Sequence, residues 1–420
     1  MKQKTNQETR VVITGLGIIA PNGIGKDNFW NSSLAGISAV DYLGNIDTSG
    51  FKTKIGAQVK DFSPQKYFNN ITLNQLDRFA QFGVAATILA KKDAGLNGKY
   101  FQADKTGVCI GSGLGGIIFH EEWLEQILRE KIKRLPPITV PKVMPNSVSA
   151  QISIMLKTTG PNLTISTACS SGLQAIGLAF ELIKSKRAET VITGGVEAPF
   201  TYATFSAFDS LRAMSQRNCP PQEASCPFDL SRDGFVLGEG AGIIVLETLE
   251  SAHKRNAEIY AEVLGFGTNS SGFHIVMPEP KGKDIAIAIQ LALKQACINP
   301  KKIDYINAHG TSTPSNDLAE TLAIKKVFGK HSKDISISST KSMIGHTIGA
   351  SGAIGIIASC LAIKHGVVPP TINYLHPDPL CNLDYTPNQA RKRKINFCLV
   401  NSFGFGGNNA VVALAKLCNN

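Results

Sequence analysis

Cys169 stands where a short β-branched run gives way to the pattern of a helix. Residues 164–172 read TISTACSSG, and apolar residues follow at helical spacing, at Leu173, Ile176, Phe180 and Ile183. A thiol at the start of a helix faces the positive end of the helix dipole, which favours the thiolate and predicts a lowered pKa. This placement suits a nucleophile, although a buried structural cysteine explains the stretch equally well.

Two histidines also follow predicted strands, and each stands beside a glycine. His309 comes after the strand predicted over residues 303–307, and His346 after the strand predicted over residues 335–339. Because ligands of open α/β sheets bind beyond the carboxyl ends of the strands, we expect both imidazoles to lie near Cys169. A thiolate with neighbouring imidazoles is suited to covalent acyl chemistry. A thiol hydrolase is an alternative, but it needs only one base.

Strands and helices alternate along the chain, which predicts an α/β fold. Around Cys169, strand 162–167 and strand 190–193 flank a helix over residues 170–186 as a βαβ unit. A second set of elements begins near residue 259. We therefore divide the chain into residues 1–258 with the cysteine and residues 259–420 with the two histidines, and we expect mainly parallel sheets in both halves.

Two other stretches have a distinct pattern. One is rich in proline and predicts an extended excursion rather than a helix, with Pro136, Pro137, Pro141 and Pro145. Residues 347–364 predict a helix that is apolar on all faces and therefore buried. Its apolar run over residues 349–363 is too short to span a bilayer, so we expect no membrane partner.

The composition is that of an ordinary soluble protein, 43% hydrophobic and 18% charged. The nine cysteines form no C-x-x-C pair and no zinc-like cluster with histidines, so we expect no metal site and reduced thiols in a cytoplasmic protein. The net charge of +11 leaves an acidic protein partner possible. Its basic residues lack the pattern of a nucleic-acid module, so nucleic acid is not expected as a partner.

Taken together, the motifs at the strand ends resemble those of β-ketoacyl synthases, most closely β-ketoacyl-[acyl-carrier-protein] synthase II and the related polyketide ketosynthases. The matching motifs are TACSSG at residues 167–172, HGTSTP at 309–314, KSxxGH at 341–346 and NSFGFGG at 401–407. The resemblance covers nearly the whole chain. It implies a thiolase fold, in which two similar halves form five alternating layers of helix and sheet. It also implies a homodimer, or alternatively a heterodimer with a ketosynthase-like subunit.

The resemblance further implies a decarboxylative Claisen condensation that elongates a fatty-acid or polyketide chain. Cys169 takes the acyl group as a thioester, and the enolate of a malonyl-carrier protein attacks it. His309 and His346 hydrogen-bond the malonyl thioester carbonyl and stabilise the enolate. The backbone amides of Cys169 and Phe405 form the oxyanion hole. Phe405 is also the gate for the acyl chain, with Phe208 in a facing loop.

Supporting roles follow from the same resemblance. Lys341 sets the local field and pairs with Glu320, and Asp317 supports the HGTSTP motif. Thr311 and Thr313 hold the pantetheine arm of the acyl carrier protein, so the substrates arrive on phosphopantetheine and no separate cofactor is expected.

Two alternatives to condensation stay open. One is a thiol acyltransferase or hydrolase, and the other is a non-catalytic subunit that shapes the cavity of a partner. The presence of Cys169 argues against the inert subunit, and the set of one cysteine with two histidines favours condensation. Biosynthetic thiolases carry a second cysteine in the C-terminal glycine-rich turn, which residues 403–407 lack.

Overall fold

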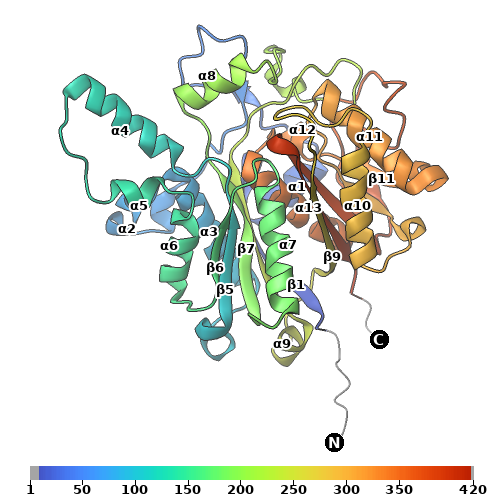
Figure 1. Ribbon diagram of the computed structural model, residues 1–420, viewed down its shortest axis with the longest axis horizontal. Coiled ribbons are helices and arrows are strands. Elements are labelled where there is room, and N and C mark those ends of the chain that lie inside the picture. Colours follow the sequence, from blue (N-terminus) through green and yellow to red (C-terminus); the bar gives the residue numbers. More distant parts are fainter. Residues whose placement is uncertain (1–8, 418–420) are drawn as a thin grey trace, which may run out of the picture.

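The computed structural model describes residues 9–417, and its strands form two groups (Figure 1). The first group is β1 (Val11–Ala20), β5 (Thr106–Gly111), β6 (Asn162–Ile165), β7 (Thr190–Glu197) and β8 (Gly240–Thr248). The second is β9 (Ala261–Ser270), β10 (Tyr305–Asn307), β11 (Ser336–Ser338), β14 (Phe397–Gly404) and β15 (Asn408–Ala415). Residues 11–13 of β1 pair with residues 261–263 of β9 and join the groups in the order β11-β10-β14-β15-β9-β1-β8-β7-β5-β6.

The prediction of mainly parallel sheets is wrong. Strand β5 runs parallel to β6 and β7, and β10 runs parallel to β11 and β14. Strands β1, β8, β9 and β15 pair antiparallel with their neighbours. Only the short turn η8 (Phe405–Gly407) links β14 to β15, so these two strands form a hairpin. Parallel neighbours need a longer crossover, which the helices provide.

The helices form three layers around the two strand groups. Helices α7 (Ser171–Lys184) and α13 (Ser351–His365) lie between the groups and contact strands of both. Helices α3 (Arg78–Asp93) and α6 (Ser147–Leu156) cover the outer face of the first group. Helices α10 (Lys283–Gln295) and α11 (Pro314–Phe328) pack together over the outer face of the second. The predicted α/β fold with five alternating layers is confirmed.

Helix α13 is buried from Ser351 to Ile363, as its apolar faces predict. The segment Ile348–His365 is long and apolar enough to cross a membrane, so the expectation that this run is too short is wrong, because the helix extends beyond residues 349–363. However, 89% of the segment is buried inside the protein. Small residues let it approach α7 closely, because a Cβ atom at Gly352 would lie 2.6 Å from Cβ of Leu173. Its apolar surface therefore serves helix packing in the core.

The proline-rich stretch is partly helical, so the expectation of an extended excursion is wrong at α5 (Thr139–Val143). Pro141 is the third residue of this helix, and its missing N–H falls in the first turn, where an amide has no intrahelical partner. Helix α4 (Ile117–Glu130) precedes it and stands away from the body of the protein (Figure 1).

The remaining elements are short. The helices are α1 (Lys26–Leu34), α2 (Asn70–Asn74), α8 (Tyr202–Ser210), α9 (Leu249–Lys254) and α12 (Lys341–Ile344). The strands are β2 (Gly23–Ile24), β3 (Asp41–Tyr42), β4 (Ile55–Gly56), β12 (Val367–Val368) and β13 (Arg391–Lys392). The division after residue 258 falls between α9 and β9 and stays a prediction.

Candidate active site

Most of the site residues predicted from the sequence line one cavity of about 390 Å³. Its walls include the side chains expected to do chemistry and those expected to bind substrate: Cys169, Phe208, His309, Thr311, Thr313, His346 and Phe405. Lys341 is buried and does not line this cavity. Segments far apart in the sequence therefore meet at this cavity, as the position of each motif after a strand predicts.

Cys169 is held at a sharp turn between strand β6 and helix α7. Ala168 has a φ of +52°, in the left-handed region that few non-glycine residues occupy. The hydroxyl of Ser171 accepts a hydrogen bond from the Thr167 N–H (2.9 Å) and donates to the Ala168 carbonyl (2.6 Å). Ser402 on β14 donates to the Cys169 carbonyl (2.8 Å). These contacts fix the strained turn and place the sulfur at the helix start.

The electrostatic setting of Cys169 differs from the sequence prediction. Burial raises the pKa of its thiol to about 11, so the expected lowering by the helix dipole is wrong. Three groups oppose this effect: the backbone N–H of Phe405, the charge of Lys341 and the backbone N–H of Cys169 itself. The two amides that act on the sulfur are those predicted for the oxyanion hole.

The two histidines lie side by side and are neutral. Their ring centroids are 5.3 Å apart, and the rings are nearly perpendicular, at 84°. Burial, together with the nearby charge of Lys341, lowers the pKa of both imidazoles well below 6.5. Nδ1 of His346 hydrogen-bonds Oγ of Ser351 (2.9 Å). Within the described residues, buried Nδ1 of His309 has no hydrogen-bond partner.

Lys341 and Glu320 do not form the predicted ion pair in the described part of the chain. The Glu320 carboxylate accepts the backbone N–H groups of His309 (2.9 Å) and Gly310 (2.8 Å) and the side-chain amide of Asn401 (2.9 Å). Burial lowers the pKa of Lys341 to about 8, and the charge of Glu320 opposes this shift through space. Glu320 therefore anchors the His309 loop, because these donors already occupy its oxygens.

The two phenylalanines predicted from the sequence, Phe208 and Phe405, are part of a largely apolar cavity wall. Phe208 lies on α8, not in the predicted loop, because a helix capped by the Thr201 hydroxyl forms there. Its ring packs edge-on against Phe235 (5.8 Å), which packs in the same way against His346 (5.5 Å). Phe405 is half-buried in turn η8, followed by Gly406 with a φ of +76°.

The two threonines lie together in the wall of the cavity. Their hydroxyls, Oγ1 of Thr311 and Oγ1 of Thr313, are 2.8 Å apart. Asp317, at the start of α11, accepts the Thr311 N–H (3.0 Å). The support that the family resemblance assigns to Asp317 thus corresponds to a direct contact with residues 311–313, here called the threonine loop.

Several residues that position this site were not predicted from the sequence. Glu197, at the end of β7, accepts the backbone N–H groups of Gly113 (2.7 Å), Leu114 (3.1 Å) and Gly349 (3.0 Å), and so ties together loops behind Cys169. Ser351 orients His346 through a hydrogen bond to Nδ1. Its place five residues after His346 in the sequence is the signal that could have indicated this contact. No local pattern marks Glu197, because its partners come from distant segments.

Comparisons with known proteins agree with this geometry. Residues 8–252 match the N-terminal domain family of β-ketoacyl synthases, and residues 260–375 match the C-terminal domain family. The 3-oxoacyl-[acyl-carrier-protein] synthase 2 of Coxiella burnetii is 43% identical over 411 residues, covering 98% of this chain and 99% of that protein.

Two solved structures are similar to this chain over its whole fold. One is a type II polyketide synthase acyl-carrier protein in complex with its ketosynthase bound to the hexaketide, and the other is the ishigamide ketosynthase/chain length factor. Each has a TM-score of 0.91 and 36% identity, and each match covers 98% of this chain and 100% of the other. The fold and site define a condensing enzyme of the thiolase fold, an acyltransferase. Within that class, the chain belongs to the β-ketoacyl synthase family.

Proposed function

We propose that this chain extends an acyl chain by decarboxylative Claisen condensation with a malonyl-acyl carrier protein, as part of fatty-acid or polyketide biosynthesis. The observation that supports this most directly is one cavity that holds Cys169, two neutral imidazoles and two backbone amides next to the sulfur. A hydrolase needs a single base and an activated water, so the paired imidazoles favour condensation.

In the first half-reaction, Sγ of Cys169 attacks the carbonyl of the acyl thioester. A carbon–sulfur bond forms to the enzyme, the bond to the carrier thiol breaks, and that thiol leaves with the proton of Cys169. The amides of Cys169 and Phe405 hold the negative oxygen of the tetrahedral intermediate, and Lys341 favours the thiolate through space. Donors fixed in a buried site stabilise such an oxyanion by several kcal/mol, about 3 kcal/mol for one donor.

In the second half-reaction, neutral His309 and His346 donate N–H bonds to the thioester carbonyl of the malonyl group. Carbon dioxide leaves, and its bonding electrons form an enolate whose oxygen those donors stabilise. The enolate carbon attacks the acyl group on Cys169, a carbon–carbon bond forms, and the thiolate of Cys169 leaves. Neutral donors suit this step because charge develops on the carbonyl oxygen during decarboxylation.

The substrates in this proposal arrive on the phosphopantetheine arm of an acyl carrier protein in the cytoplasm, and no further cofactor or metal takes part. Thr311 and Thr313, which line the cavity, hold that arm. The carrier proteins named for the Coxiella burnetii relative and for the polyketide ketosynthase complex support this partner. The net charge of +11 suits an acidic partner.

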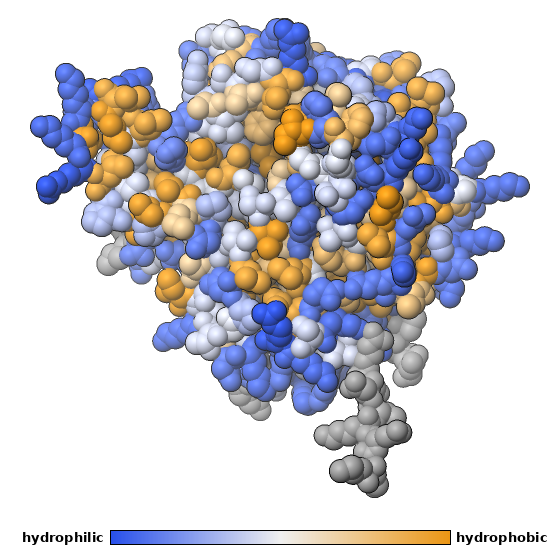
Figure 2. All heavy atoms as spheres, viewed as in Figure 1, coloured by the Kyte–Doolittle hydropathy of each residue, from blue (hydrophilic) through white to orange (hydrophobic). Residues whose placement is uncertain are grey.

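A homodimer is part of the proposal. Strand β6 is the last strand of the sheet, and strand edges invite pairing with another chain. Helices α4, α5 and α6 nearby expose large apolar side chains, namely Leu124, Leu128, Val140, Ile154 and Met155. Figure 2 shows apolar surface over α4 on the left of the molecule. The ishigamide ketosynthase/chain length factor makes a heterodimer the second candidate.

The test is condensation of hexanoyl-carrier protein with radiolabelled malonyl-carrier protein, read as β-ketoacyl product and released carbon dioxide. The wild-type protein should form the product, and Cys169→Ala should not. Cys169→Gln should still release carbon dioxide without condensing. Normal condensation by Cys169→Gln contradicts the nucleophile, hydrolysis alone supports the hydrolase, and no acylation of Cys169 supports the inert subunit.

A further inference from the structure

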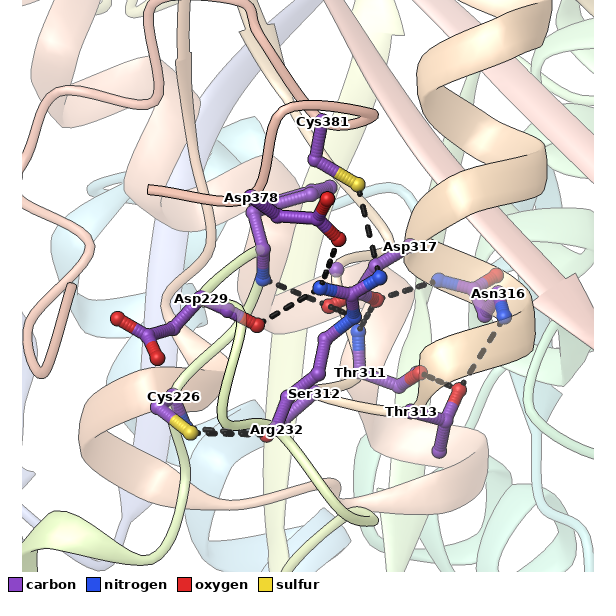
Figure 3. A network of polar contacts seen from close by, with 12 residues as sticks. Cys226, Asp229, Arg232, Thr311, Ser312, Thr313, Asn316, Asp317, Asp378 and Cys381 are labelled. Atoms are coloured by element: carbon purple, nitrogen blue, oxygen red, sulfur yellow. Dashed lines mark hydrogen bonds and ion pairs between the residues drawn. The ribbon is translucent and has the colours of Figure 1, made fainter. Parts of the chain in front are cut away.

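A buried guanidinium lies behind the threonine loop, outside the set of residues that the reaction uses. The side chain of Arg232 is 6% exposed. Its Nη1 donates to the Asp229 carbonyl (2.7 Å) and to Oδ2 of Asp378 (2.7 Å), and its Nε lies 3.8 Å from Oδ2 of Asp317. Figure 3 shows these groups around Arg232 at the meeting point of loops from three parts of the chain.

Asp317 lies between Arg232 and the threonine loop and contacts both. Its Oδ1 accepts the Thr311 N–H (3.0 Å) and the Asn316 side-chain amide (3.1 Å), and its Oδ2 accepts the Phe228 N–H (2.8 Å). An ionised carboxylate is acceptor-only, so it can accept all three of these hydrogen bonds while its charge attracts the guanidinium. Burial raises the pKa of Asp317 to about 6, and the charge of Arg232 opposes that shift. Arg232 therefore favours the charged form of Asp317, whose oxygens accept the backbone N–H groups of Thr311 and Phe228.

The loop that Asp317 holds is strained and needs such support. Ser312, between the two threonines, has a φ of +69°. Its carbonyl accepts the Gly234 N–H (3.1 Å), and its hydroxyl accepts the Cys226 N–H (3.0 Å). Gly234 and Asp233 line the same cavity as the threonines and directly follow Arg232 in the chain. Arg232 thus links two segments of the cavity wall, residues 233–234 and the threonine loop.

We propose that Arg232 is a positioning residue for the pantetheine arm, because it fixes the loop that presents Thr311 and Thr313 to the cavity. The inference rests on the proposed function and adds a residue to the binding of the carrier-linked substrate. Arg232 does not line the cavity, so it acts through Asp317 and not by contact with substrate.

The test compares two thioesters of one acyl group, hexanoyl-pantetheine and S-ethyl hexanethioate, which lacks the arm. The measurement is kcat/KM for acylation of Cys169 by mass spectrometry, in the full-length protein. The variants are Arg232→Met and Arg232→Lys. Arg255→Met is the matched control, because Arg255 is a buried arginine that pairs with Glu247 at a site outside the cavity.

We expect Arg232→Met to lower kcat/KM for hexanoyl-pantetheine by about tenfold or more, chiefly through KM, and to change the value for S-ethyl hexanethioate little. Arg232→Lys should recover part of the loss, since an ammonium keeps the charge without the planar fork. Arg255→Met should lower protein stability, but it should not change the ratio of the kcat/KM values for the two thioesters. Equal losses on both thioesters, or no loss beyond that of Arg255→Met, would overturn the inference.

Asp378→Asn keeps the test decisive if Arg232→Met does not fold. It removes one partner of Arg232 while retaining the shape, and it should raise KM for hexanoyl-pantetheine in the same direction by a smaller factor. An unchanged KM contradicts the inference. This test measures only the acylation of Cys169. If the wild-type protein became acylated but did not condense, the proposed function would be contradicted, but the comparison of the two thioesters would still test the role of Arg232.

Discussion

At the scale of single residues, burial decides which groups carry charge in this site. Desolvation raises the pKa of Cys169 and lowers the pKa values of Lys341 and both histidines, so each of these groups is shifted toward its neutral form. The neutral imidazoles are the form that donates to a carbonyl oxygen. Burial disfavours the charged thiolate of Cys169, and the two backbone amides and the charge of Lys341 partly offset that effect.

This setting predicts how stability depends on pH. The pKa values of His309 and His346 lie well below 6.5 in the folded protein, so the unfolded chain binds more protons once the pH falls below 6.5. Each histidine should therefore remove about 1.4 kcal/mol of unfolding free energy at pH 5.5 relative to pH 7.5. Urea denaturation of wild-type protein and His346→Asn measures this. If the free energy of unfolding fell by the same amount between pH 7.5 and pH 5.5 in both proteins, that result would contradict the burial of His346 in its neutral form.

At the scale of elements, close backbone approach holds the nucleophile between the central helices. Helix α7 begins at Ser171, two residues after Cys169, and Gly172 in its first turn faces backbone atoms of two other segments. A Cβ atom there would lie 2.5 Å from the Gly349 carbonyl oxygen and 2.9 Å from Cα of Gly195. Neither contact is with a flexible side chain, so the helix itself would have to shift.

Gly172→Ala should therefore lower the free energy of unfolding by about 1–3 kcal/mol, the usual range for overpacking. The shift of α7 should also slow acylation of Cys169. Gly44→Ala is the control, because a Cβ atom at Gly44 meets nothing within 4 Å, and its effect should stay within about 0.5 kcal/mol. Urea denaturation and the acylation rate are the measurements. Wild-type stability in Gly172→Ala would show that the close packing at this turn is not rigid.

At the scale of the whole molecule, the edge of the sheet and the apolar face beside it predict association. Ile154 on α6 is 69% exposed and lies in the helix that packs beside β6. Ile154→Glu should shift the protein from dimer to monomer in analytical ultracentrifugation, because a charge would be buried in the interface. Ile287→Glu is the control, since Ile287 lies 44% exposed on α10, in the opposite outer layer. A monomeric wild-type protein contradicts the proposed dimer.

Much of the site follows from the sequence alone. Cys169, His309 and His346 each come after a predicted strand, and the carboxyl ends of strands in an α/β sheet share an edge, so their convergence could be predicted. The burial of α13 followed equally from its apolar faces. These conclusions depend on local periodicity and on the order of the motifs, both of which are properties of the chain itself.

Only the tertiary structure decided the charges, the pairings and the strand directions. The helix dipole suggested a lowered pKa for Cys169, but the depth of burial depends on segments hundreds of residues away, and burial has the larger effect. Backbone amides occupy the Glu320 carboxylate, so Lys341 acts through space. Arg232 gained a role only when three distant loops met around it, because desolvation and hydrogen bonding are set by proximity in space.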